Sequence, residues 1–331
     1  MKKLSILLAL ALLLTMSALL FTGCSSDDYD FTVGVISGSQ IAAFAEGRTG
    51  FEARLTELME EAGYTVRFLY DNAAGEASMA NPIATNYVTQ EVDLIFSMGT
   101  GASQAALPVA RDAEIPFVFG IITDPVGSNL VVPNVSTGSS SALPMDTQVD
   151  LLEELLGVSL DADNRVAVLH SMEEDNAVAT LNRMIAAAPA DSIVPLGIPN
   201  QGAAQLAALF TTIAADETIR AIYIPQDNQL VALITQVQNL NRDLENSLPV
   251  VVADLPIVEG RSVAALTVCF EENGARAAEI AFDILVNDNW HPSFYAPSAE
   301  TLTLYINLEE AEYIGFEVPQ SLINRADEVF D

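Results

Sequence analysis

Residues 93–122 read DLIFSMGTGASQAALPVARDAEIPFVFGII, and this stretch predicts the fold most directly. It holds two continuous apolar runs, at 93–98 and 116–122. Between them, a segment that opens with Gly99-Thr100-Gly101 is predicted to be helical through Ala110. Apolar runs of this length that alternate with helices indicate strands buried on both faces of a parallel sheet. The stretch therefore predicts one repeating unit of an α/β fold.

The same alternation continues on both sides. On the N-terminal side, strand candidates at 31–36 and 65–70 flank an amphipathic helix at 46–62. On the C-terminal side, a segment at 131–143 with Pro, Gly and several Ser interrupts the pattern, and we interpret it as a crossover between domains. The pattern then restarts, with strands predicted at 165–170, 192–198, 220–225, 249–253, 263–270 and 301–306 and helices at 145–156, 176–188, 202–215, 227–244 and 273–286.

Two series of alternating strands and helices predict an α/β protein with two doubly wound, Rossmann-like lobes that contain parallel sheets. The length of 331 residues agrees, because it fits about two domains. In doubly wound sheets, ligands bind beyond the carboxyl ends of the strands. The residues that follow each predicted strand are therefore the candidate ligand contacts.

The chain is strongly acidic, with 13 Lys plus Arg against 45 Asp plus Glu and a formal net charge of −32. Its only lysines are Lys2 and Lys3. A chain with this balance repels phosphate backbones and anionic lipid headgroups, which excludes binding to nucleic acid or to a membrane surface through charge. An acidic body without lysine also suits salty surroundings, a hypothesis that rests on composition alone.

No catalytic or cofactor chemistry can be assigned from the residues. The two cysteines form no CxxC motif and the two histidines are far apart, so a zinc site has no set of ligands. Gly99-Thr100-Gly101 lacks the lysine of a phosphate-binding loop. His170 has no assignable nucleophile partner. We therefore expect no enzyme activity, metal or cofactor, and we expect Cys269 to be an inert buried thiol.

The first residues form a targeting segment rather than part of the fold. Met-Lys-Lys precedes an apolar run at 4–21, and residues 20–24 read Leu-Phe-Thr-Gly-Cys. This arrangement indicates a secretory signal, and it resembles the lipobox of bacterial lipoproteins. The resemblance implies a signal peptide at 1–23, a lipidated Cys24 and a short tether through residue 30. The alternative is an uncleaved N-terminal helix that anchors the chain; either way, the body lies outside the cytoplasmic membrane.

Small, polar and acidic residues directly follow the predicted strands. None of these short segments after the strands contains Arg or Lys. A polyanionic ligand would normally be met by such cations. The Thr100–Ser103 loop opens a helix, where backbone N–H groups and hydroxyls can hold one carboxylate. Asp124, Asp227 and Asp254 can meet an ammonium group. The strand ends therefore favour a zwitterion or a cation as the ligand.

Three blocks resemble a known family: ITDPVG at 122–127, AIYIPQDN at 221–228 and LYINL at 304–308. They are similar to the substrate-binding proteins of bacterial ABC transporters of the TrpX type, and residues 100–105 are similar to a loop of that family. The resemblance implies a type I periplasmic-binding-protein fold with a ligand cleft between two lobes that close by hinge motion. It implies a small-molecule ligand: an amino acid, with the aromatic amino acids as one option, or a similar zwitterion.

Carried onto this chain, the resemblance gives eight candidate ligand contacts: Thr100, Ser103, Thr123, Asp124, Glu174, Asn176, Asp227 and Asp254. The expected roles are that the Thr100–Ser103 loop takes a ligand carboxylate and that Asp227 or Asp254 takes an ammonium group. Two structural alternatives stay open. Asp227 can simply cap the following helix, and Thr123-Asp124-Pro125 can be only a turn. The chain departs from the family pattern at Gly101, Ser103, Asp175 and Gln226.

The expected division places 31–141 with 267–293 in lobe 1, and 142–266 with 294–331 in lobe 2. The chain is then a monomeric, lipid-anchored, extracytoplasmic receptor, at the cell surface or in the periplasm, that delivers its ligand to an ABC permease. The alternative is an extracytoplasmic sensor subunit of a signalling receptor. Transport and sensing use the same closing lobes, so the residues favour neither over the other.

Overall fold

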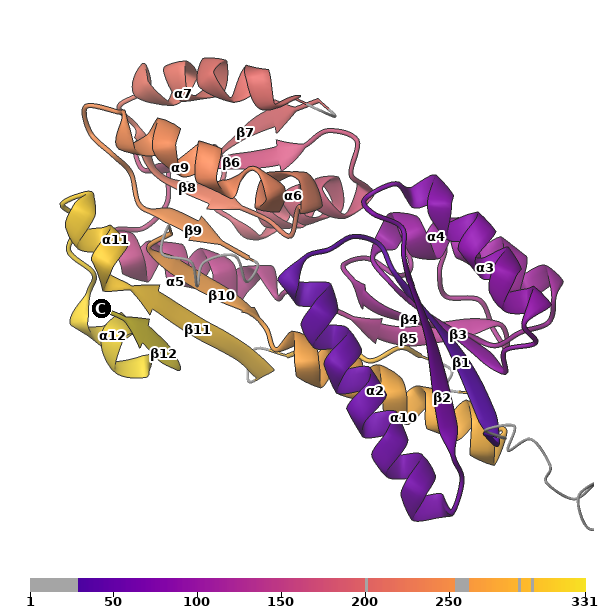
Figure 1. The fold of residues 1–331 in the computed structure, drawn as a ribbon. Helices are drawn as coiled ribbons and strands as arrows, with labels where there is room; N and C mark the ends of the chain where they lie inside the picture. The colour runs from indigo at the N-terminus through magenta and orange to yellow at the C-terminus, as the bar shows by residue number, and fades with distance from the viewer. Residues whose placement is uncertain (1–28, 200–201, 254–261, 291–292, 299–300) are drawn as a thin grey trace, which may run out of the picture.

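The computed structural model describes residues 29–199, 202–253, 262–290, 293–298 and 301–331, so Cys24 and Asp254 lie outside the described residues. Its first sheet has the strand order β2-β1-β3-β4-β5, and all of its pairs are parallel. The elements of this part are β1 (Phe31–Ser37), α2 (Ala42–Ala62), β2 (Val66–Asn72), η2 (Ala77–Met79), α3 (Ala80–Thr89), β3 (Leu94–Met98), α4 (Thr100–Asp112), β4 (Phe117–Ile122) and β5 (Ser136–Ser140). The sheet is drawn in indigo to purple in Figure 1.

The second sheet has the order β12-β11-β10-β9-β8-β6-β7, and only β11 runs antiparallel to its neighbour β10. Its elements are α5 (Met145–Leu156), β6 (Arg165–Ser171), α6 (Asp175–Ala187), β7 (Ile193–Ile198), η3 (Gly202–Gln205), α7 (Leu206–Ala214), β8 (Ile219–Ile224), α8 (Asn228–Ala232), α9 (Ile234–Arg242), β9 (Val250–Val252), β10 (Ala264–Val268), β11 (Leu302–Asn307), α11 (Leu308–Tyr313), α12 (Gln320–Arg325) and β12 (Glu328–Phe330). Buried aliphatic side chains of β6, β8 and β9 form its core.

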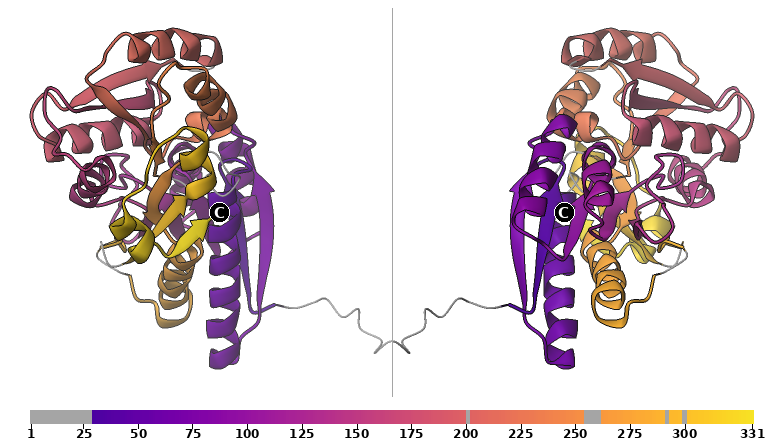
Figure 2. Two further views of the ribbon diagram at one scale, coloured as in Figure 1. Left: turned by 90° about the vertical axis from the view of Figure 1, so that its left-hand side faces the viewer. Right: turned by 90° about the vertical axis from the view of Figure 1, so that its right-hand side faces the viewer.

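Helix α10 (Phe270–Asn287) returns the chain to the first sheet and lies beside α2, as the views of Figure 2 show. Asn273 on α10 fixes this position. Its Nδ2 donates to the carbonyl of Ser140 (2.7 Å), and its Oδ1 accepts from the hydroxyl of Ser139 (2.8 Å) and the N–H of Ile121 (3.2 Å). The chain therefore passes between the sheets after β5, before α10 and again between α10 and β11.

The predicted fold class is confirmed, two local expectations are wrong and one is incomplete. The segment 131–143, interpreted as a crossover, leads out of the first sheet only after Ser140, because it first forms β5, whose small residues leave room for close backbone packing; a Cβ at Gly138 would lie 1.9 Å from the carbonyl oxygen of Phe119. The helix expected at 227–244 is broken into α8 and α9. Cys269 is exposed rather than buried, because β10 ends at Val268. Within the described residues, the structure contains no helix with the length and apolar character of a membrane span.

Candidate ligand-binding site

Two adjoining cavities lie between the sheets, at the carboxyl ends of their strands. Together with adjoining space that is open to solvent, the inner cavity has an empty volume of about 330 Å³ and the outer cavity about 890 Å³. They share residues of both lobes: Phe44, Gly99, Thr100, Asn176 and Asn228. We treat the two cavities as the inner and outer parts of one candidate site.

The N-terminus of α4 supplies an anion-binding edge to both parts. Its first intrahelical hydrogen bond runs from the N–H of Ser103 to the carbonyl of Gly99 (3.0 Å), so the N–H groups of residues 100–102 have no intrahelical acceptor. Gly99 has φ 91°, and a Cβ there would lie 2.8 Å from the ring of Phe44, so glycine is required on both counts. The helix dipole and the Thr100 hydroxyl at this edge suit one carboxylate.

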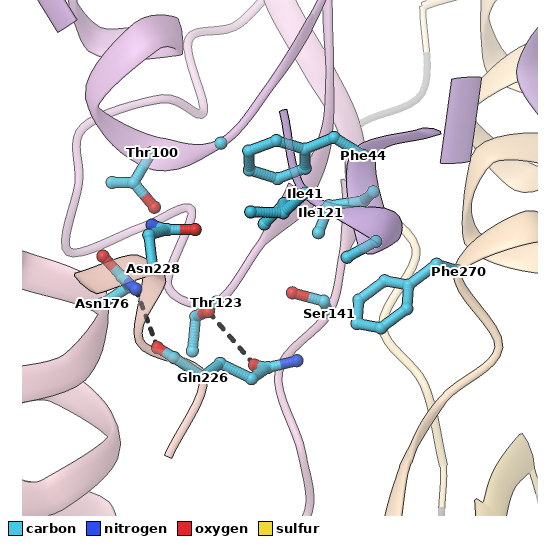
Figure 3. Close-up of a pocket in the computed structure, with 12 residues that line it drawn as sticks. Ile41, Phe44, Thr100, Ile121, Thr123, Ser141, Asn176, Gln226, Asn228 and Phe270 are labelled. Atoms are coloured by element: carbon cyan, nitrogen blue, oxygen red, sulfur yellow. Dashed lines mark hydrogen bonds between the residues drawn. The ribbon is translucent and has the colours of Figure 1, made fainter. Parts of the chain in front are cut away.

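The inner part of the cavity has an apolar wall, formed by Ile41, Phe44, Ile121 and Phe270 (Figure 3). Ile121 has a φ of 56°, which is an outlier for a β-branched residue. This conformation coincides with the register shift between β4 and β5. Such bulges redirect a side chain at a functional site, and here the redirected side chain belongs to the wall of the cavity.

Acidic side chains lie along the outer part of the cavity, where Glu173, Glu174 and Asp175 come from the start of α6. The Glu174 carboxylate accepts hydrogen bonds from the N–H of Gln229 (3.0 Å) and from the N–H and Nδ2 of Asn228 (both 3.1 Å). Burial, followed by the negative charge of Asp227, raises the pKa of Glu174. None of the described residues that line either cavity is Lys, Arg or His. The charge of the outer part therefore favours a cationic group.

Asp227 lies behind the cavity rather than in its lining. It is 1% exposed, and its carboxylate accepts from the N–H of Ser171 (2.6 Å), the Ser171 hydroxyl (2.8 Å) and the N–H of Leu230 (2.9 Å). Burial raises its pKa. All of these partners belong to the second lobe, so the structure favours the capping alternative for Asp227.

The other candidates divide into two groups. Thr100, Thr123 and Asn176 line the inner cavity, and Glu174 lines the outer one. The structure does not bring Ser103 and Asp124 to the lining. Ser103 is fully buried and bonds to the Ser97 hydroxyl (3.0 Å). Asp124 accepts the N–H of Gly127 (2.9 Å), which is the turn alternative.

The sequence analysis missed several lining residues, namely Ile41, Phe44, Ile121, Ser141, Asn228 and Phe270. Asn228 and Gln226 stood inside the quoted family block, so a signal was available for both. Ser141 and Phe270 carry no such signal in the sequence, because they become part of the site only where the chain passes between the sheets. The Thr123 hydroxyl, on the first lobe, donates to Oε1 of Gln226 on the second (3.2 Å).

Two mainly parallel α/β sheets, connected by repeated crossings and enclosing a cavity between them, define a type I periplasmic binding protein. The chain belongs to the family described as ABC transporter substrate binding protein, whose family model matches residues 32–330. The resemblance found in the sequence is thereby confirmed. Members of this family are extracytoplasmic substrate-binding proteins and not enzymes.

Three relatives illustrate the similarity. The chain is 23% identical over 291 residues, 80% of each protein, to the "Tyrosine-binding protein" of Clostridioides difficile (strain R20291). It matches the structure of an ABC domain of Streptococcus pneumonia in complex with L-Trp, with a TM-score of 0.73, 22% identity and coverage of 90% of this chain and 100% of that one. It also matches a ligand-free, open substrate binding protein with adhesive properties from Clostridium difficile, with a TM-score of 0.67, 20% identity and coverage of 91% and 99%.

Proposed function

We propose that this chain binds an aromatic α-amino acid between its lobes and delivers it to an ABC permease. The observation that carries the proposal is the distribution of groups along the cavity: an apolar wall at the inner end, a helix N-terminus in the middle and carboxylates at the outer end. An aromatic amino acid carries the complementary groups, with its ring at one end and its carboxylate and ammonium together on the α-carbon at the other. The names of the two relatives that mention tyrosine and L-Trp support the same ligand class.

Each polar group of such a ligand has a partner in this arrangement. The ligand carboxylate lies against the N–H groups of residues 100–102 and the Thr100 hydroxyl. The ammonium lies between Glu174 and the side-chain oxygen of Asn228, which points into the cavity in Figure 3. Nδ2 of Asn228 donates to Glu174 (3.1 Å), so the oxygen is the end of this amide that can accept from an ammonium. The ring packs on Phe270, Phe44 and Ile121.

Ligand class is tested by a thermal-shift panel on residues 25–331. Tyrosine, tryptophan and phenylalanine are expected to raise the melting temperature, because a ligand that binds only the folded state stabilises it. Lysine, glutamate, ribose and myo-inositol are the controls, and they should leave it unchanged. A rise with a sugar and none with any aromatic amino acid would overturn the proposal.

The anchor and the transporter partner complete the proposal. Removal of residues 1–23 and acylation of Cys24 would tie the receptor to the outer face of the cell membrane, where two acyl chains hold stably. Metabolic labelling with a fatty acid should mark the wild-type chain and not Cys24→Ser.

Light scattering on residues 25–331 should give the mass of a monomer. Uptake of labelled aromatic amino acid should fall when this gene is deleted, and an unchanged uptake would contradict delivery to a permease.

A further inference from the structure

We propose that the inner end of the cavity selects a ring that carries a hydroxyl, as in tyrosine, over an unsubstituted ring, and that Ser141 and Gln226 recognise this hydroxyl. The proposal rests on the proposed function, because it assumes that an aromatic amino acid enters with its ring toward the inner end. It adds the feature that distinguishes one aromatic ligand from another.

Ser141 is the first observation. Its side chain lines the inner cavity, the residue is only 1% exposed, and its hydroxyl has no hydrogen-bond partner. Figure 3 shows this hydroxyl directed into the cavity and away from the ring of Phe270. Buried hydroxyls nearly always have a partner, so an unpartnered one that faces a cavity indicates a group supplied by a ligand.

Hydrogen bonds of Ser141 and its neighbours hold the backbone at this position. The hydroxyl of Ser140 donates to the carbonyl of Ile122 (2.8 Å), and that of Ser139 donates to Asn273 (2.8 Å). The backbone N–H of Ser141 also donates to the carbonyl of Ile122 (2.9 Å). The backbone of Ser141 is therefore held in place while its hydroxyl stays available.

Gln226 supplies the second group. Its Oε1 accepts from the Thr123 hydroxyl (3.2 Å), and its backbone carbonyl accepts from Nδ2 of Asn176 (2.8 Å). The bond from Thr123 holds Oε1 of the amide, and Nε2 points away from Thr123 in Figure 3, while the bond from Asn176 holds the backbone of Gln226. Gln226 is 6% exposed and lines the same cavity.

Together the two groups match a hydroxyl better than other ring substituents. A phenol oxygen accepts from Nε2 of Gln226 and donates its proton to the Ser141 oxygen, so both buried groups become satisfied. An unsubstituted ring leaves both unpaired, which should weaken binding on the order of 10- to 100-fold. An indole N–H only donates, so tryptophan satisfies Ser141 alone and should bind with intermediate affinity.

The test is isothermal titration of residues 25–331 with tyrosine, phenylalanine and tryptophan, on the wild type, Ser141→Ala and Thr100→Ala. Tyrosine should bind the wild type about 10- to 100-fold more tightly than phenylalanine. Ser141→Ala should weaken tyrosine and leave phenylalanine unchanged, which reduces the ratio to under about 5-fold. Thr100→Ala is the matched control, because it should weaken both ligands equally through their common carboxylate and keep the ratio.

The results of these titrations separate this proposal from the proposed function. Equal affinities of the wild type for tyrosine and phenylalanine, or a ratio that Ser141→Ala leaves intact, would overturn this proposal and leave the proposed function standing. Failure of the wild type to bind any aromatic amino acid would overturn both. A circular-dichroism melt of each variant confirms that it is folded, and Gln226→Leu repeats the measurement from the second group.

Discussion

Glu174 is the charged residue on which ligand binding should depend most at the scale of single residues. Its carboxylate is shared between the start of α8 and the outer cavity, and its pKa is raised by burial and by the charge of Asp227. A ligand ammonium nearby favours the charged form and lowers that pKa again. Binding and the ionisation of Glu174 are therefore linked.

This linkage predicts a pH dependence with a definite sign. Because the pKa of Glu174 falls on binding, the ligand expels protons, and its affinity should increase as the pH rises from about 4 to 7. Titration calorimetry in two buffers of different ionisation enthalpy measures the released protons. Glu174→Gln should bind about 10-fold or more weakly at pH 7 and lose the pH dependence. Proton uptake by the wild type would contradict this role.

Asp227 gives the contrasting prediction. Its three hydrogen bonds stay inside the second lobe, and one of them caps α8. Asp227→Ala should therefore lower the free energy of unfolding by about 1–3 kcal/mol while changing ligand affinity only a few-fold. Urea unfolding and calorimetry on the same protein measure both quantities. A large loss of affinity with unchanged stability would instead make Asp227 a ligand contact.

At the scale of elements, the crossing of α2 and α10 places the start of α10, and with it Phe270, at the cavity. A Cβ at Gly50 would lie 1.9 Å from the carbonyl oxygen of Glu271, and a Cβ at Gly274 would lie 1.9 Å from that of Gly47. The backbones of the two helices therefore touch. Glycine at these positions is needed for that approach, although it disfavours a helix interior.

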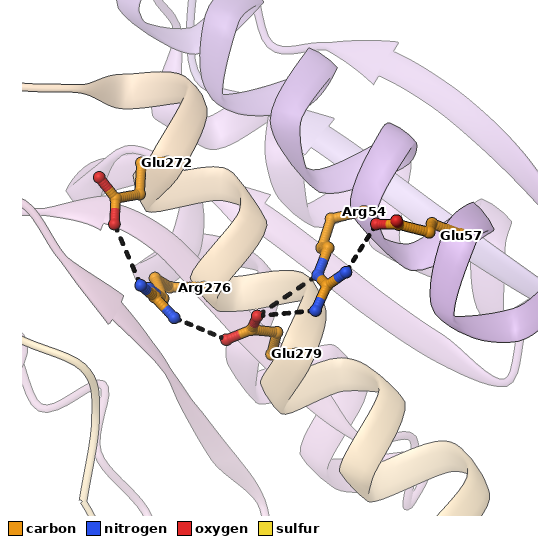
Figure 4. A network of polar contacts seen from close by, with 5 residues as sticks. All are labelled: Arg54, Glu57, Glu272, Arg276 and Glu279. Carbon is orange, nitrogen blue, oxygen red and sulfur yellow. Dashed lines mark hydrogen bonds and ion pairs between the residues drawn. The ribbon is translucent and has the colours of Figure 1, made fainter. Parts of the chain in front are cut away.

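An ion network also spans these helices, as Figure 4 shows. Arg54 on α2 pairs with Glu57 (2.6 Å) and with Glu279 on α10 (3.2 Å), and Arg276 pairs with Glu279 and Glu272 (both 3.1 Å). These side chains are 33% to 57% exposed, so water and salt screen their charges. The close packing at the glycines should contribute more to stability than the network does.

The substitution Gly50→Ala tests whether the close packing of the two helices contributes more to stability than the ion network does. It should lower the free energy of unfolding by about 1–3 kcal/mol, because the new methyl group forces the helices apart. It should do so although alanine favours a helix by about 1 kcal/mol over glycine. Thr49→Ala, at the exposed neighbouring position, is the control and should stay within about 0.5 kcal/mol. Chemical denaturation measures both, and a neutral or stabilised Gly50→Ala would contradict the close contact.

The sequence predicts some strands and site residues and not others. The apolar runs at β1, β3, β4, β6 and β8 predict buried strands because both faces of a parallel sheet are covered. Strand β5 has no apolar run, since Ser and Gly are selected there by contact with α10 and β4, and such contacts have no local pattern. Ser141 and Phe270 were missed for the same reason. Thr100 was found because a glycine-rich turn before a helix is a local signal.

At the scale of the whole molecule, hydrogen bonds between described residues join the lobes across the cleft. The Thr123 hydroxyl donates to Gln226, and Nε2 of Gln104 donates to Asp175 (3.5 Å). The relative from Clostridium difficile described above is open and ligand-free. We propose that ligand binding adds to these bridges and holds the lobes together, which is the hinge closure that the fold uses.

The net charge of −32 also acts at this scale. Repulsion among like charges destabilises the compact state, and salt screens that repulsion. The melting temperature of residues 25–331 should therefore rise between low and molar sodium chloride. Scanning calorimetry at several salt concentrations measures this, and a constant or falling melting temperature would count against the proposed adaptation to saline surroundings.

The central claim is that the cavity between the lobes holds an aromatic amino acid in one orientation. A crystal structure of residues 25–331 grown with L-tyrosine tests it most directly. We expect the ligand carboxylate at the N–H groups of residues 100–102, its ammonium at Glu174 and its ring against Phe270, with the phenol oxygen within hydrogen-bond distance of Ser141. Tyrosine bound in the reverse orientation, or a cleft that stays empty at saturating tyrosine, would contradict it.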